Sequence, residues 1–178
     1  MTIVLLATLT LILFSAIAAA DAVYFHIIKY KLYARKESRY EHKLHTFNAV
    51  LFPFTGLFLF AENFGGAALW AGFILTVVTF GLEGLVVACE KDSRRNIGGL
   101  TTLEYGLHMA MVGLRVAFTA LIFAQKPVSA WTQAEVFLIP NYTDFTRSVG
   151  GCVFLSGLVM AAWHIVLLYW RPSAKLST

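Results

Sequence analysis

Five long apolar stretches occupy most of this 178-residue chain and limit what it can fold into. A helix needs about 20 apolar residues to cross a bilayer, and each stretch is close to that length. They run from Thr2 to about Ile28, Leu44 to Ala61, Ala67 to Cys89, Leu103 to Ala124 and Val149 to Trp170. Charged residues make up only 13% of the chain, well below the share in soluble domains. We therefore expect an all-α, multi-pass membrane protein with five transmembrane helices, forming a single domain over residues 1–178.

Lysine and arginine are distributed unevenly between the two sides of the expected membrane. Eleven follow the first, third and fifth stretches, whereas only Lys126 and Arg147 lie in the loop at residues 125–147. Because cytoplasmic loops are enriched in these residues, we expect the N terminus outside, the C terminus in the cytoplasm and the plasma (inner) membrane as the location. The basic residues border apolar segments, so we expect membrane lipid as their partner and no nucleic acid.

The start of the chain also admits a second interpretation. Residues 17–22, IAAADA, resemble the small-residue cleavage site of a signal peptide. The first stretch lacks the basic region that precedes such peptides, and it contains an acidic residue, Asp21, for which a role is suggested below. We therefore favour a retained first helix.

An internal repeat is visible around two similar segments. SRYEHKLH, from Ser38, and TTLEYGLH, from Thr101, both read [Ser/Thr]-x-x-Glu-x-x-Leu-His. Upstream, Asp21 lies 20 residues before Glu41, and Glu83 lies 21 residues before Glu104. The repeat predicts two helical hairpins of the same topology, at about residues 3–62 and 67–125, that form a four-helix bundle. An outer loop at 125–147 and a fifth helix at about 148–171 follow.

Each repeat places a glutamate four residues before a histidine, as Glu41 and His45 or Glu104 and His108. Positions i and i+4 share a helix face. An acidic residue within a span usually faces the protein interior, as we expect for the carboxylates of the other two helices. Four carboxylates and two histidines from four helices suit a dinuclear metal site. The predicted ligands are Asp21, Glu41, His45, Glu83, Glu104 and His108. The alternative is that both glutamates are only capping-box residues that bond the start of their own helix.

Further polar residues lie near these six. His164, His26 and Glu90 are reserve ligands, whereas His42 lies off the Glu41 and His45 face and is expected to be solvated. Arg115 lies on the face of His108, about 10 Å deeper in the membrane. It either forms an ion pair with Asp21 or anchors an anionic or polar group in the membrane interior, and Asn48 faces the same way from the second helix.

The ligand set resembles that of the di-iron and di-manganese carboxylate four-helix bundles, over roughly Asp21 to Arg115 and in donors and architecture only. Those proteins use Glu-x-x-His, whereas this chain has Glu-x-x-x-His twice. The resemblance implies two divalent metal ions. The donors suit iron first, and also manganese or zinc.

An oxidoreductase that acts on a lipophilic small molecule near the cytoplasmic leaflet would follow, with a separate reductase as partner. Three alternatives remain open. The first is a haem b protein with His45 and His108 as axial ligands. The second is a metal-ion carrier or sensor, and the third is a purely structural membrane protein.

Overall fold

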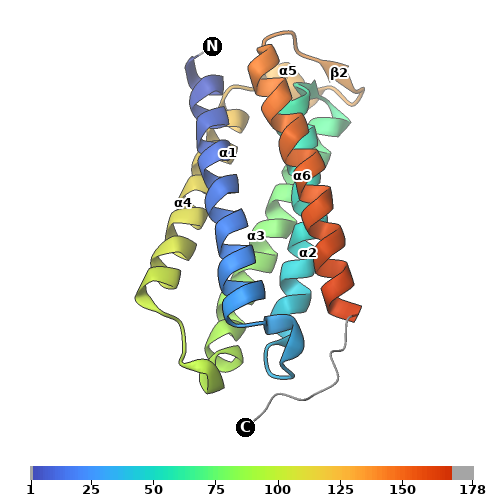
Figure 1. Ribbon diagram of the computed structural model, residues 1–178. Helices are drawn as coiled ribbons and strands as arrows, with labels where there is room; N and C mark the ends of the chain where they lie inside the picture. Colours follow the sequence, from blue (N-terminus) through green and yellow to red (C-terminus); the bar gives the residue numbers. More distant parts are fainter. Residues whose placement is uncertain (1, 170–178) are drawn as a thin grey trace.

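The computed structural model describes residues 2–169, and it is helical over most of that length (Figure 1). The five long helices are α1 (Thr2–Ala20), α2 (Arg39–Gly56), α3 (Ala67–Ser93), α4 (Thr102–Ala124) and α6 (Asp144–Tyr169). The short helices are η1 (Asp21–Lys29), η2 (Leu32–Ala34), η3 (Leu57–Ala61), η4 (Arg95–Ile97) and α5 (Val128–Thr132). Two short strands, β1 (Phe64–Gly65) and β2 (Phe137–Leu138), pair antiparallel. The expected end of the fifth helix at Trp170 or Arg171, and Lys175 in the tail, lie outside the described residues.

The all-α prediction is confirmed, with five helices long and apolar enough to cross a membrane. Two of these spans combine neighbouring helices, because α1 continues into η1 and α2 continues into η3. The five candidate spans are 23 to 28 residues long, which exceeds the minimum of about 20. Three helix ends differ from the apolar stretches, because α2 begins at Arg39, α3 ends at Ser93 and α6 begins at Asp144. Hydropathy marks only the apolar part of each helix, whereas the backbone hydrogen bonds continue into its polar ends.

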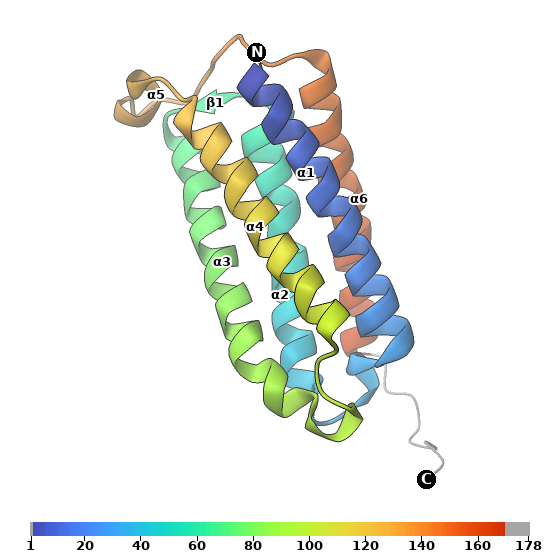
Figure 2. The same cartoon turned by 90° about the vertical axis from the view of Figure 1, so that its left-hand side faces the viewer.

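The long helices pack in a defined order. α1 lies along α4, while α2 lies against both α3 and α6 (Figures 1 and 2). Glycines permit the close approach of α6, because a Cβ atom at Gly150 would overlap the backbone of Phe60 and Ala61. A Cβ atom at Gly157 would likewise come within 2.7 Å of the Pro53 ring.

The apolar core and the buried polar residues occupy different halves of the molecule. Leu11, Leu59, Phe118 and Ile122 belong to a fully buried cluster towards the end that carries the N terminus, α5 and the strands (Figure 1). The opposite half contains most of the buried charged and imidazole side chains, including those discussed below. Apolar packing therefore holds the helices together at the end that carries the N terminus, and the polar site lies at the opposite end.

Candidate metal centre

A π-helix brings Asp21 and His26 onto one face. η1 continues α1 with i→i+5 hydrogen bonds, so residues five apart are stacked one above the other. Nε2 of His26 lies 3.3 Å from Oδ2 of Asp21, and both side chains are buried. In an α-helix the same two residues would diverge, which is why the sequence indicates His26 only as a reserve ligand.

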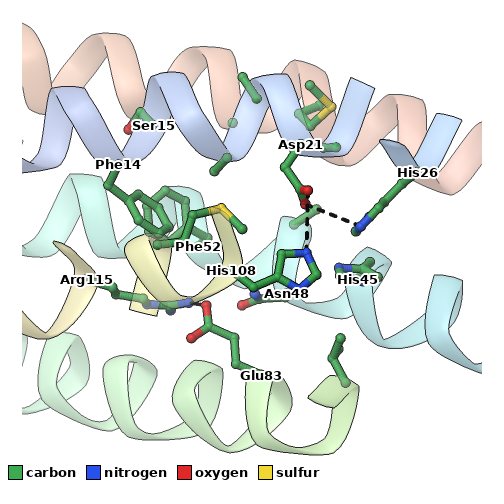
Figure 3. Close-up of a pocket in the computed structure, with 18 of the residues that line it drawn as sticks. Phe14, Ser15, Asp21, His26, His45, Asn48, Phe52, Glu83, His108 and Arg115 are labelled. Carbon is green, nitrogen blue, oxygen red and sulfur yellow. Dashed lines mark hydrogen bonds and ion pairs between the residues drawn. The ribbon is translucent and has the colours of Figure 1, made fainter. Parts of the chain in front are cut away.

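Two histidines from other helices face this pair (Figure 3). Nε2 of His108, on α4, lies 3.4 Å from Oδ1 of Asp21. The ring centroid of His45, on α2, lies 4.2 Å from that of His26, and the His108 centroid lies 6.2 Å from it. Three imidazoles and one carboxylate from three spans therefore converge on one buried point.

The donor atoms form two overlapping groups. Asp21, His26 and His108 each offer an atom within 4.8 Å of the others, and so do His26, Glu41 and His45. His26 belongs to both groups. Oδ1 of Asp21 and Nε2 of both His26 and His45 are buried and accept or donate no hydrogen bond within residues 2–169. Buried polar atoms normally form hydrogen bonds, whereas these atoms have only ion-pair contacts of 3.3 to 3.7 Å with neighbouring side chains, and their convergence fits the demands of a cation.

Carboxylates also contact His108 and His45, Glu90 on the His108 nitrogen that faces away from Asp21 and Glu41 on the buried Nε2 of His45. Nδ1 of His108 lies 3.1 Å from Oε1 of Glu90, on α3, while its Nε2 faces Asp21. Oε1 of Glu41 lies 3.7 Å from Nε2 of His45. A carboxylate on the distal nitrogen of an imidazole is the usual arrangement around a metal-binding histidine, where it fixes the ring and raises its basicity. Glu90 therefore contacts His108 from outside the two donor groups found within residues 2–169.

The two repeat glutamates converge on one arginine. Arg94 donates from Nη2 to Glu41 over 2.8 Å and from Nη1 to Glu104 over 2.6 Å, and all three side chains are buried. Burial by itself lowers the pKa of Arg94, but the hydrogen bonds to Glu41 and the negative charge of both glutamates outweigh it and leave the pKa raised. Glu104 thus forms its ion pair with Arg94, whereas Glu41 contacts both Arg94 and His45.

Capping accounts for one of these glutamates only in part. The Thr101 hydroxyl accepts a hydrogen bond from the backbone N–H of Glu104, which is half of a capping box. Ser38 makes no such cap and instead donates its hydroxyl to the Ser93 carbonyl. Ser93 in turn donates to the Glu41 carboxylate.

Glu83 lies apart from the two donor groups. It accepts a hydrogen bond from Nη1 of Arg115, which reaches it from α4 (Figure 3). The alternative in which Arg115 pairs with Asp21 is therefore wrong, because Glu83 takes that place and leaves Asp21 to the histidines. The guanidinium also lies over the rings of Phe52 and Phe80, at 5.3 and 5.0 Å from their centroids.

The expectation that His42 is solvated is wrong. His42 is 1% exposed and stacks on His164, with ring centroids 5.3 Å apart. The reason is that α6 packs against α2 and places His164 on the His42 ring, a contact that hydropathy alone does not indicate. His164 also lines the chamber described next, but neither of these two histidines belongs to the two donor groups found within residues 2–169.

A chamber of about 280 Å³ adjoins the cluster. Asp21, His26, His45 and His108 line one end of it, and Asn48, Glu83 and Arg115 line it further along the helices. Alanine, valine, methionine and phenylalanine side chains form most of the remaining wall. A largely apolar chamber with a few convergent polar groups is typical of a small-molecule site.

Comparisons of this chain with protein-family models, with curated proteins and with solved structures found no match. The similarity to di-metal carboxylate bundles therefore remains one of donor set and helical architecture. The site must be interpreted from its own geometry.

Proposed function

We propose that this chain is a membrane-embedded metal-binding protein, and that it acts as an oxidoreductase on a lipophilic substrate held in the adjoining chamber. The convergence of buried donor atoms from Asp21, His26 and His45 that form no hydrogen bond within residues 2–169 is the observation that carries the proposal. His108 completes the set, with Glu90 behind it. Bringing these groups together without a cation is costly, because buried charges and polar atoms need partners.

We further propose that the site holds two divalent metal ions. The two donor groups share His26, and each contains a carboxylate and two imidazoles. Such donors suit iron, and manganese or zinc would also fit them. A bound iron or manganese pair would supply redox chemistry to the chamber, with electrons from a separate reductase.

The membrane arrangement is part of the proposal. The distribution of lysine and arginine supports an outer N terminus and an inner C terminus. Pseudo-twofold symmetry of the two hairpins about the membrane normal is supported by Arg94, which contacts the equivalent residues Glu41 and Glu104. Single cysteines at the exposed positions Lys36 and Val128, in a chain lacking Cys89 and Cys152, test the orientation. A membrane-impermeant thiol reagent should label only the Val128→Cys protein in intact cells.

The haem alternative has weaker support. A porphyrin between His45 and His108 would need the space between the two rings. His26 lies against both of them, with ring centroids 4.2 and 6.2 Å away. A Soret band in the purified protein would nevertheless favour haem over the metal pair.

Anaerobic titration of the metal-depleted protein with Fe(II), Mn(II) and Zn(II) tests the proposal. We expect saturable binding of up to two ions per chain, which His45→Ala and His108→Ala should each reduce. Glu83→Gln serves as the comparison, because Glu83 pairs with Arg115 outside both donor groups. If Glu83→Gln removed as much metal as His45→Ala, the ligand set would be wider than proposed. No saturable binding by the unaltered protein would refute the metal function itself.

A further inference from the structure

A second polar group lies in the chamber, away from the histidines. Arg115 is two helical turns beyond His108 on α4, hence about 10 Å further into the membrane. Its side chain is 1% exposed and lines the chamber together with its ion-pair partner Glu83. This group, which we term the arginine station, is defined by those two residues.

The arginine station offers N–H groups that have no hydrogen-bond partner, although its positive charge is already balanced by a carboxylate. Nη1 of Arg115 binds Glu83, whereas Nε and Nη2 have no partner within residues 2–169. The Glu83 carboxylate already balances the guanidinium, and its second oxygen also lacks a partner. An anion placed here would be repelled by Glu83 as much as it is attracted by Arg115. An uncharged oxygen acceptor would use the free N–H groups without that repulsion.

The surroundings of the station are aromatic and apolar. The rings of Phe14, Phe52 and Phe80 lie 5.0 to 6.0 Å from the guanidinium carbon. Between the station and the histidines, small and branched apolar side chains form the wall. A molecule that fits must therefore be largely hydrocarbon or aromatic, with one polar oxygen at this end.

The chamber opens sideways, towards the surface that lipid would cover. Val87 on α3 is 61% exposed and Val112 on α4 is 39% exposed, yet both line the chamber. Both helices lie on the face seen in Figure 2, where α4 is packed along α1 rather than along α3. These exposed wall residues give a molecule dissolved in the bilayer a route into the chamber.

We propose that the arginine station binds the carbonyl oxygen of an uncharged lipophilic molecule, which lies in the chamber with its hydrocarbon part towards the histidines. This inference names the substrate class of the proposed function. It rests on that function, because the bound molecule is a substrate only if the metal site reacts with it. Arg115 positions the molecule, and the metal-binding residues lie where its far end would react.

Three probes of one shape test the inference: para-octylacetophenone, para-octylbenzoate and para-octylethylbenzene. Binding is measured by equilibrium dialysis against the metal-free protein in nanodiscs. We expect the ketone to bind about tenfold or more tightly than the hydrocarbon, the ratio that one hydrogen bond from a charged donor supports. The ketone should also bind more tightly than the carboxylate.

Two variants separate charge from hydrogen bonding. Glu83→Gln leaves the positive charge of Arg115 without a counter-charge, so this variant should bind the carboxylate probe more tightly than the ketone. Arg115→Met combined with Glu83→Gln removes both charges, and the ketone should then bind no better than the hydrocarbon. Binding of para-octylethylbenzene should survive in both variants, which shows that the chamber is still folded.

Equal binding of ketone and hydrocarbon by the unaltered protein would overturn the inference, and so would a preference for the carboxylate. Metal content is measured on the same preparations after reloading. If the ketone is selected but no metal binds, the proposed function fails while the carbonyl site stands. If metal binds but the ketone is not selected, only the carbonyl site fails.

Discussion

Glu90 holds His108 in place, with Oε1 of its carboxylate 3.1 Å from Nδ1 of the imidazole. The opposite nitrogen, Nε2, then points at Asp21 over 3.4 Å. Three elements contribute to this row of side chains, because Glu90 lies on α3, His108 on α4 and Asp21 on η1. The arrangement fixes both the orientation of the ring and the nitrogen that is left for a metal ion.

Replacing Glu90 with Gln should therefore weaken metal binding without removing a ligand. Loss of a supporting carboxylate typically costs about 10- to 100-fold in metal affinity, because the imidazole becomes less basic and less well oriented. Competition against a chelator of known affinity measures the change. Asp92→Asn is the control, since Asp92 pairs only with the exposed Arg95 and should leave the affinity unchanged. Equal affinities for all three proteins would show that Glu90 has no such role.

Arg94 should be the most important single residue for stability at the site end of the molecule. Arg94→Met would leave Glu41 and Glu104 buried without their shared partner, at a cost of about 3–5 kcal/mol in the free energy of unfolding. Arg94→Lys should recover only part of this, because an ammonium cannot reproduce the planar fork that contacts both carboxylates. Denaturation in detergent measures the loss. Arg95→Met, at an exposed position, should change stability by less than about 0.5 kcal/mol. A similar small effect at Arg94 would contradict the structure.

The sequence predicts the helices well and the site only in part. The spans follow from hydropathy, because membrane thickness sets a minimum apolar length that few other structures satisfy. Asp21, His45 and His108 are indicated because acidic residues and spaced imidazoles are rare in spans. His26 is indicated only as a reserve ligand, because its alignment with Asp21 depends on the π-helical register of η1, for which the sequence gives no signal.

The partners of the glutamates also depend on packing that local sequence does not encode. Glu104 corresponds to Glu41 in the repeat and Glu83 corresponds to Asp21, yet Glu104 and Glu83 each pair with an arginine from elsewhere in the fold. Arg94 lies in the turn after α3, and its position depends on how α3 meets α2 and α4. The burial of His42 under α6 is a further contact between distant segments.

Two adjacent glycines of α6 should respond in opposite ways to alanine. A methyl group at Gly150 would overlap the backbone where η3 ends, so Gly150→Ala should destabilise by roughly 1–3 kcal/mol through overpacking. Gly151 has open space around its Cα, and Gly151→Ala should be neutral or stabilise the helix by up to about 1 kcal/mol. Thermal unfolding of the two proteins side by side measures both effects. Equal shifts would mean that α6 does not approach α2 as described.

Lys126 should make stability depend on pH in the alkaline range. Burial lowers its pKa from the ordinary 10.5 to about 8, while Nζ donates to the Asn63 side chain and the Phe64 carbonyl. Between these two values the unfolded chain binds more protons at this residue than the folded one, so its contribution to stability rises as pH increases. The stability of the unaltered protein relative to Lys126→Met should therefore grow from pH 7.5 to pH 10. Parallel pH profiles would show that the pKa is not depressed.

His26 is the histidine around which the proposed metal site is built, because both donor groups share it. Elemental analysis of the purified protein and of two variants tests this role most directly. His26→Ala should lose essentially all bound iron, manganese or zinc per chain. His42→Ala, which changes an equally buried histidine outside both groups, should retain the full content. Full metal content in the His26→Ala protein would contradict the account.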